Sequence, residues 1–371
     1  QLKPNQHEAH FGDTQDFQQF SEALQKTLQA RPVFPVPSSV GLVSYKFNEE
    51  TGTYEKVQGS LGPLLAERAT TSGRGHVNLS FSHTFSDFES FNGSDTIPLT
   101  LRHCLTSACT FGRPVDDPAL TYLKDVIAVD VRLKLKSSVL ATAVTYGLTD
   151  RVDVGVVVPY IRNDLNVLTN ARVIVDPTSN AAIHVFDPAI ETPGQFGTAH
   201  ALGIGDVILR GKFQVPAKLP FQTGVMADVT LPSGDKENFL GTGDLRVKGT
   251  FIVSKTSTRF SPHVNIGYEL NTTNTDLSSV EYRAGSEIVA RPRVTLLFDL
   301  LGTIQPSGDD EFRVRALGDE SLIPRSVIDG ALGAKWQFTD RATLNFNFLM
   351  PLNDSGIRPN SVVTFGVQFG M

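Results

Sequence analysis

From residue 74 to the end of the chain, apolar and polar residues alternate with a period of two. The run 127–135 places Ile, Val and Leu at odd positions and Ala, Asp, Arg and Lys between them, and the run 363–369 repeats the pattern with Val and Phe. A period of two is that of a β-strand with two different faces. Turn sequences such as Thr-Asp-Arg at 149–151 and 339–341 separate successive runs. The pattern predicts an all-β fold of antiparallel strands.

The polar face of these strands carries many charged side chains. Such groups cost kcal/mol each in a dry core or in lipid, so they need contact with water. We therefore expect an antiparallel transmembrane β-barrel, with the apolar face toward lipid and the polar face toward a lumen. The candidates for lining that lumen are Arg132, Lys134, Asp153, Arg210, Lys212, Asp228, Arg246, Lys248, His263, Glu269, Glu281, Arg283 and Asp329.

The connections between the runs form two sets, and their lengths predict the strand number. The tight set is 149–151, 216–220, 255–258, 291–292 and 339–341. The other set is longer and polar: 87–124, 163–203, 233–242, 305–325 and 352–359, with 271–277 as its short member. Short turns at one rim and long loops at the other are typical of outer-membrane barrels. If both ends of the barrel lie at the short-turn rim, residues 125–148 cross as one long passage and the barrel has about 12 strands.

Residues 1–73 follow a different pattern, so we divide the chain into this N-terminal segment and a barrel over 74–371. Apolar residues at helical spacing predict one short amphipathic helix over 14–29, and three prolines over 31–39 interrupt regular structure. The stretch 43–57 predicts a small hairpin. We expect the segment to be a plug or a periplasmic appendage. If the hairpin joined the wall instead, the barrel would have 14 strands.

Composition narrows the class of protein further. The 371 residues carry a net charge of −6, whereas nucleic-acid binders usually present a basic face. No apolar stretch reaches the 18 or so residues of a membrane-spanning helix, and a mean hydropathy of −0.08 fits strands whose two faces cancel. For an exported protein, Cys104 and Cys109 favour a disulfide, and the first residues fit a mature form whose signal peptide has been removed.

Enzymatic chemistry has little support in the sequence. There is no Gly-x-Ser-x-Gly elbow, no phosphate-binding loop and no zinc spacing. Ser261, His263 and Asn265 share one polar strand face, but side chains two residues apart lie about 7 Å apart, beyond hydrogen-bond reach. The acidic cluster 309–311 has the oxygen ligands that Ca²⁺ prefers, although an exposed loop explains it as well. We expect no catalytic residues, no metal and no cofactor.

Three motifs occur in order along the middle of the chain. They are Tyr-Gly-Leu-Thr-Asp-Arg at 146–151, Gly-Ile-Gly-Asp at 203–206, and Leu-Pro-Ser-Gly-Asp at 231–235 followed by Leu-Gly-Thr-Gly at 240–243. Taken alone, they are explained by turn and bend chemistry. Together they resemble the outer-membrane transporter family named for the MetA pathway of phenol degradation. The resemblance covers roughly residues 140–371 and implies a barrel that passes small, often hydrophobic or aromatic, compounds.

Two questions stay open from the sequence. The lumenal charges either pair across strands and plug the lumen, or form a ring that selects solutes. The function we expect is a channel in the bacterial outer membrane for passive passage of small molecules, with lipid, the barrel-assembly machinery and the solute as partners. The alternative is a structural or partner-docking barrel, and a barrel enzyme comes third. The sequence does not predict an oligomeric state.

Overall fold

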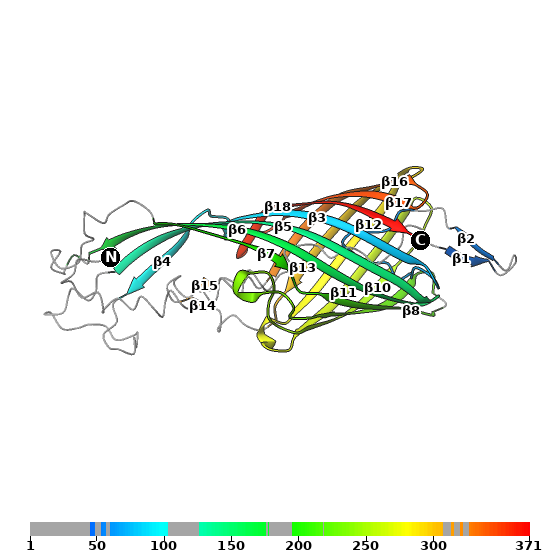
Figure 1. The fold of residues 1–371 in the computed structure, drawn as a ribbon, viewed down its shortest axis with the longest axis horizontal. Helices are drawn as coiled ribbons and strands as arrows, with labels where there is room; N and C mark the ends of the chain where they lie inside the picture. Colours follow the sequence, from blue (N-terminus) through cyan, green and yellow to red (C-terminus); the bar gives the residue numbers. More distant parts are fainter. Residues whose placement is uncertain are drawn as a thin grey trace.

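The computed structural model describes residues 45–48, 53–56, 60–102, 126–175, 177, 195–217, 219–306, 313–314, 320–321 and 326–371. Its main element is an antiparallel sheet that closes on itself because β5 pairs with both β3 and β6 (Figure 1). The predicted barrel of 12 strands is confirmed. In sheet order the wall strands are β3 (Val77–Phe91), β18 (Ile357–Gly370), β17 (Ala342–Pro351), β16 (Ser326–Thr339), β13 (Val294–Ile304), β12 (Ser279–Arg291), β11 (Phe260–Asn271), β10 (Arg246–Ser254), β9 (Gln222–Thr230), β8 (Ile208–Val215), β6 (Val152–Ile174) and β5 (Val126–Thr149).

The N-terminal hairpin stands apart from the wall. β1 (Tyr45–Asn48) pairs with β2 (Thr53–Lys56) as predicted, but the pair forms a separate two-stranded sheet. The alternative of 14 wall strands is therefore wrong. A further short pair joins β14 (Arg313–Val314) to β15 (Glu320–Ser321). The predicted helix over 14–29 lies outside the described residues.

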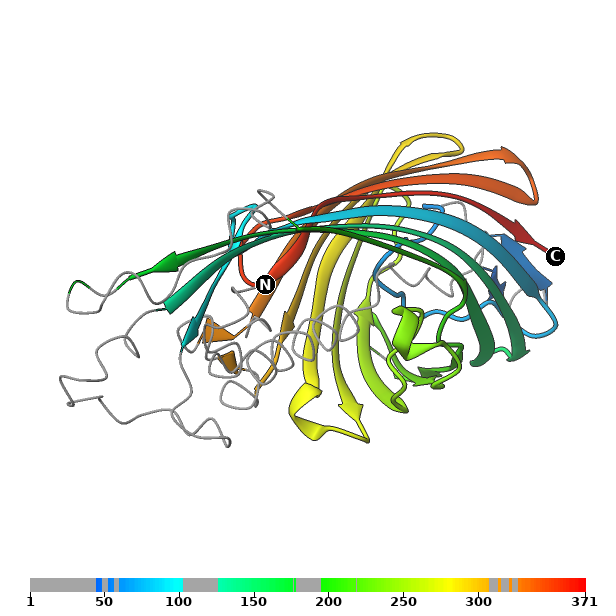
Figure 2. The same ribbon diagram turned by 60° about the vertical axis from the view of Figure 1, so that its left-hand side comes forward.

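β5 and β6 extend well past the rest of the wall and form a projecting sheet (Figures 1 and 2). They have 24 and 23 residues, whereas a strand needs only about 9–11 to cross a bilayer. The projecting part of β5 pairs with β4 (Ile97–Arg102), and that of β6 pairs with β7 (Gln195–Ile204). β7 and β8 thus follow one another along β6 and act as one strand broken at residues 205–207.

The two faces of the wall differ as the alternation predicts. Outward side chains are large and apolar, and Phe251, Ile266 and Trp336 are 50%, 55% and 54% exposed. Their strand neighbours point inward and are polar and buried, as His263 and Asn265 show. An apolar outer wall around a polar interior is the arrangement of a barrel that spans a membrane.

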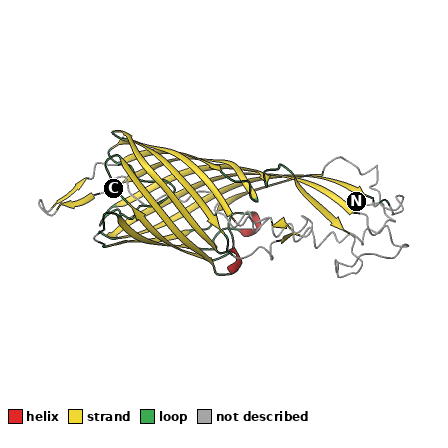
Figure 3. Cartoon of the chain, turned by 180° about the vertical axis from the view of Figure 1, so that it is seen from behind, coloured by secondary structure: helices red, strands yellow, loops and turns green. Residues whose placement is uncertain are grey.

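The five tight connections predicted from the sequence lie at one rim, together with the start of β3 and the end of β18 (Figure 3). We call this the short-turn rim and the opposite one the long-loop rim. The predicted loop 163–203 is partly strand, because β6 continues to Ile174 and β7 begins at Gln195. Two 3-10 turns, η3 (Lys236–Asn238) and η4 (Thr275–Leu277), lie in loops of the long-loop rim. No helix among the described residues is long and apolar enough to cross a membrane.

The projecting part of β5 corrects the predicted orientation of two residues. Arg132 and Lys134 share a face with the outward Leu140 and Tyr146, and their side chains are 57% and 46% exposed. They do not line the lumen. Beyond the bilayer the outer face meets water, so the charged row of β5 points outward there. Its aliphatic row, which includes Val131, turns to the buried inner face.

Candidate functional site

A segment from the N-terminal side of the barrel crosses its interior. Residues 60–73, which we call the lumenal segment, enter from the short-turn rim and return to it, where Arg74 N donates to Asp150 Oδ1 over 3.3 Å. Between these points Leu65, Glu67 and Arg68 are each 2% exposed. Burial of two charged side chains inside the barrel requires partners on the wall.

The first half of the lumenal segment lies against β12, β13 and β16. Leu61 N donates to Thr295 Oγ1 over 3.0 Å, and Lys335 Nζ donates to Pro63 O over 2.8 Å. Leu64 and Leu65 pack on inward residues of β13 and β16, in particular Leu297. Backbone carbonyls and a small apolar cluster together fix this half to one side of the lumen.

The second half is held by ion pairs. Arg68 forms a buried pair with Glu287 of β12, and its Nε lies 2.8 Å from Oε1. Glu67 lies 3.1 Å from Arg210 and 3.5 Å from Lys212, both on β8. The segment therefore links β12 and β8, four strands apart in the wall, through charges of both signs.

These pairs belong to a larger belt of buried charges that contains most of the predicted lumenal residues. Arg210 binds Asp228 through two hydrogen bonds of 2.7 and 3.0 Å. The other pairs of the belt are Lys212–Asp153, Lys248–Asp228, Lys248–Glu281, Arg283–Glu281 and Arg246–Glu269. Asp329 instead pairs with Arg358 toward the long-loop rim. The observed arrangement is mutual pairing of the charges, mostly across strands.

His263 lies inside the belt but does not contact the serine that the sequence places near it. Its Nε2 is 2.8 Å from Asp299 Oδ1, and its Nδ1 is 3.6 Å from Glu287 Oε1. Ser261 Oγ instead donates to Ser257 O over 3.2 Å. The geometry thus holds His263 between two carboxylates and gives Ser261 a backbone partner instead.

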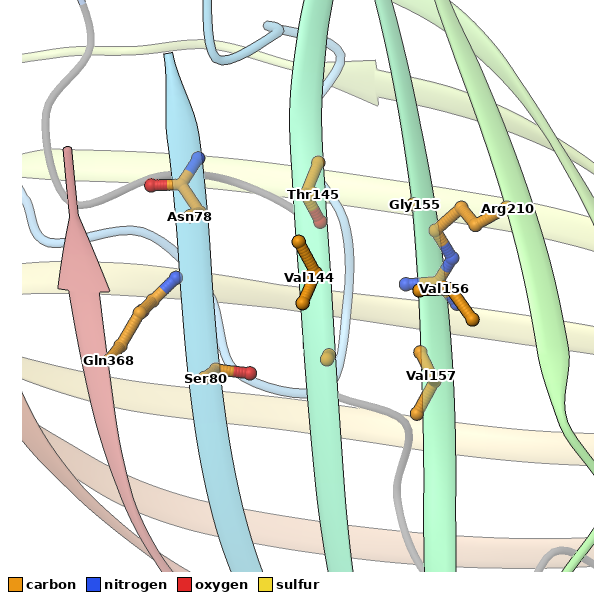
Figure 4. A pocket seen from close by; sticks show the side chains of 10 residues that line it. Asn78, Ser80, Val144, Thr145, Gly155, Val156, Val157, Arg210 and Gln368 are labelled. Atoms are coloured by element: carbon orange, nitrogen blue, oxygen red, sulfur yellow. The ribbon is translucent and has the colours of Figure 1, made fainter.

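Two small recesses flank Arg210. Figure 4 shows the first, in which Arg210 lies beside Val156 and Val157 of β6, while Gln368 of β18 and Ser80 of β3 line the far side. The second is lined by Arg210 together with Glu67, Lys248 and other charged residues. Arg210 thus lines both a mostly uncharged recess and a charged one.

A second segment that enters the barrel interior lies on the long-loop side. The β9–β10 loop, residues 231–245, turns into the barrel and is attached to the wall at Asp206, so we call it the pinned loop. The carboxylate of Asp206 accepts from Gly234 N at 3.0 Å, and from Thr242 N and Thr242 Oγ1 at 2.8 Å each. A Cβ at Gly241 would overlap Asp206 Oδ1, so the approach requires glycine.

The pinned loop places Leu240 on an apolar patch of the inner wall. The patch comprises Val139, Ala141, Ala143, Val157, Ile161 and Ile208, from β5, β6 and β8. Leu240 is 6% exposed, and burying it contributes roughly 1.5–3 kcal/mol. Phe239 precedes it in the left-handed conformation, φ 56°, which is uncommon for a bulky residue. Asn163 Nδ2 donates to Phe239 O over 2.8 Å and supports this turn.

The pinned loop brings together three sequence motifs, each of which turn chemistry explains separately. The motif 203–206 supplies the carboxylate, 231–235 opens the loop, and 240–243 supplies Leu240 and the threonine donor. Their close approach within one unit was not predicted. The only signal in the sequence was the co-occurrence of one acidic residue with several glycines, which turn chemistry also explains.

Two other predicted features concern residues that the structure does not describe. Cys104, Cys109 and the acidic cluster 309–311 lie outside the described residues, so the disulfide stays a prediction. Within the described parts of the chain, no group of three or more His, Cys, Asp or Glu side chains could hold a metal ion.

The family resemblance is confirmed over part of the barrel. Residues 134–298 match the family model described as "Putative MetA-pathway of phenol degradation". The match spans under half of the chain and includes all three motifs and the pinned loop. No curated protein sequence matches the chain.

Solved structures with a similar fold include several outer-membrane proteins. The toluene transporter TbuX of Ralstonia pickettii is 10% identical, with a TM-score of 0.38 over 80% of this chain and 89% of its own. The CymD monoaromatic hydrocarbon channel is 9% identical, with a TM-score of 0.37 over 80% and 88%. A FadL homologue of Pseudomonas aeruginosa is 8% identical, with a TM-score of 0.34 over 80% and 89%.

Proposed function

We propose that the chain is a channel of the bacterial outer membrane for passive passage of small hydrophobic or aromatic molecules. The observation that carries the proposal is the apolar patch on the inner wall of a closed barrel. A polar lumen suffices for a channel that passes ions and sugars. Buried Val139, Val157 and Ile208 on the inner face instead offer an apolar surface to a solute without charge.

The lumenal segment is the plug in this proposal. The short-turn rim faces the periplasm, as in other outer-membrane barrels. The segment then lies across the periplasmic half of the lumen, and its contacts with Arg210, Glu287 and Lys335 keep it there. A solute reaches the apolar patch first and passes the plug afterwards. Lipid around the outer wall and the barrel-assembly machinery are the further partners we infer.

Uptake by intact cells tests the proposal. Cells that express the chain and cells with an empty vector are compared for the initial uptake of radiolabelled toluene, with glycerol as the polar comparison. We expect faster toluene uptake with the chain and little change for glycerol. Equal toluene rates at matched amounts of folded barrel would refute the channel.

The projecting sheet supports a second candidate function, a docking barrel. β4, β5, β6 and β7 extend beyond the bilayer, and β7 exposes Phe196 and Leu202 by 67% and 60%. An exposed edge strand with uncharged side chains can add a strand from another chain. A barrel that never increases uptake but retains a partner through this sheet would favour docking over transport.

A further inference from the structure

We infer that Leu240 occupies a binding site for a small uncharged apolar solute and acts as the selectivity constriction of the barrel. The inference rests on the proposed channel function and adds the position, the chemistry and the residue that controls access. Three features support it: the patch under Leu240, the polar groups around it, and the rigidity of the loop that carries it.

The patch is apolar although it faces the inside of the barrel. Val139 is fully buried, and Val157 and Ile208 are 3% and 6% exposed. Leu240 is the loop residue that packs on them. A side chain from a loop rather than from the wall therefore covers this part of the inner surface. A solute of similar size and polarity makes the same contacts where the Leu240 side chain turns aside or is truncated.

The polar groups next to the patch are already bonded to each other. Ser137 Oγ donates to Asn163 Oδ1 over 2.7 Å, while the Asn163 amide donates to Phe239 O over 2.8 Å. The Asp206 carboxylate accepts from Gly234 and Thr242. The site thus combines aliphatic contacts with a border of polar groups whose hydrogen bonds are already made. Such a surface favours a solute with an apolar body, such as a single aromatic ring, and gives no compensation for desolvating an ion.

The loop holds Leu240 at a fixed position. Besides the Asp206 contacts, Leu240 N donates to Asp235 O over 2.9 Å, and Ser233 Oγ donates to Gly205 O over 3.0 Å. Hydrogen bonds on both sides of residue 240 tie the loop to the break between β7 and β8. Selection then depends on the size of the side chain at position 240, because the loop as a whole has little freedom to move away.

Crystals of the full-length chain locate the site independently of transport. Wild type, Leu240→Ala and Leu209→Ala are soaked with bromobenzene, whose bromine gives an anomalous signal. Leu209 is the neighbour of Ile208 on the outer wall and serves as the matched control. Truncating Leu240 leaves an apolar void of the kind that binds benzene in other proteins. We expect bromine beside Val139 and Ile208 in Leu240→Ala and none there in Leu209→Ala; an empty patch in Leu240→Ala overturns the site.

Uptake by cells tests the role in selection. We expect Leu240→Ala to raise benzene uptake several-fold over wild type without a matching rise for glycerol, and Leu240→Trp to lower it. An equal rise for glycerol means a general opening, and bound bromobenzene with unchanged uptake means a site off the pathway; either overturns the inference. If wild type does not exceed the empty vector, the channel proposal fails, while the bromine position still decides whether the site exists. Should Leu240→Ala fail to assemble, Leu240→Val replaces it in both experiments.

Discussion

Glu67 and Arg210 are 143 residues apart in the sequence and form a buried ion pair, with 3.1 Å between Oε1 and Nη1. The pair ties the lumenal segment to the wall at β8, where Arg210 also binds Asp228. One guanidinium thus connects the lumenal segment, the wall and both recesses. Under the proposed function, its partners keep the lumenal segment across the periplasmic half of the lumen.

Glu67→Gln is expected to loosen the plug. The substitution removes the anion that faces both Arg210 and Lys212, so the segment loses its charge-assisted contacts on that side of the lumen. Ionic conductance in planar bilayers should increase over wild type. The control is Glu89→Gln on the outer face of β3, where the carboxylate pairs with Lys134, and it should conduct like wild type. Identical conductance for Glu67→Gln would mean that this pair does not hold the plug.

The Arg68–Glu287 pair is expected to contribute strongly to stability. Both side chains are buried, so Arg68→Met removes the guanidinium partner of a buried carboxylate and should lower the free energy of unfolding by about 3–5 kcal/mol. Urea unfolding in lipid vesicles measures the loss.

The double variant with Glu287→Gln should lose less than the sum of the single losses, by about 0.5–3 kcal/mol. Arg132→Met is the control, because its contact with Asp95 at 3.9 Å is exposed and exposed pairs contribute about 0–1 kcal/mol. Strictly additive losses at 68 and 287 would argue against the pair.

A charged side chain on the outer wall should destabilise the barrel. Phe251 lies midway along β10 and points outward, so Phe251→Arg is expected to cost about 2–4 kcal/mol if the residue faces the centre of a bilayer. Phe251→Leu should cost far less. Unfolding of both variants in lipid vesicles gives the comparison, and equal stability would contradict a lipid-facing wall.

Gly147 is expected to be irreplaceable where the lumenal segment leaves the barrel. A Cβ at this position would overlap the carbonyl oxygen of Gly73, a backbone atom that cannot rotate away. Gly147→Ala should therefore reduce the folded fraction and cost about 1–3 kcal/mol or more. Gly211 has no atom within 4 Å of an added Cβ, so Gly211→Ala should assemble like wild type. Heat-modifiability on gels measures both, and normal assembly of Gly147→Ala would contradict the contact.

The wall could be predicted from the sequence because side chains alternate along each strand between a face toward lipid and a face toward the interior. The alternation around Phe251 and Ile266 shows which side faces lipid. The alternation gave the wrong face for Arg132 and Lys134. A row of apolar residues on a strand shows that this face is away from water, but it does not show whether the face meets lipid or a covered inner surface. The difference becomes clear only when β5 is compared with its shorter neighbours, because β5 continues beyond the point where they end. The sequence alone does not show where neighbouring strands end relative to one another.

The interior was harder to predict for a different reason. Arg210 and Asp228 are on adjacent strands, so their pairing follows from register. Glu67 and Leu240 reach their partners through irregular backbone, which no periodicity describes. The turn interpretation of Asp206 and Gly241 accounts for each residue separately and leaves their contact unexplained.

Toluene uptake by cells treated with an uncoupler tests the central claim most directly, because it asks whether an apolar solute passes this barrel without an energy source. The account predicts an initial rate above that of empty-vector cells and unchanged by the uncoupler. A rate no higher than the vector's, at matched amounts of folded barrel, would contradict it.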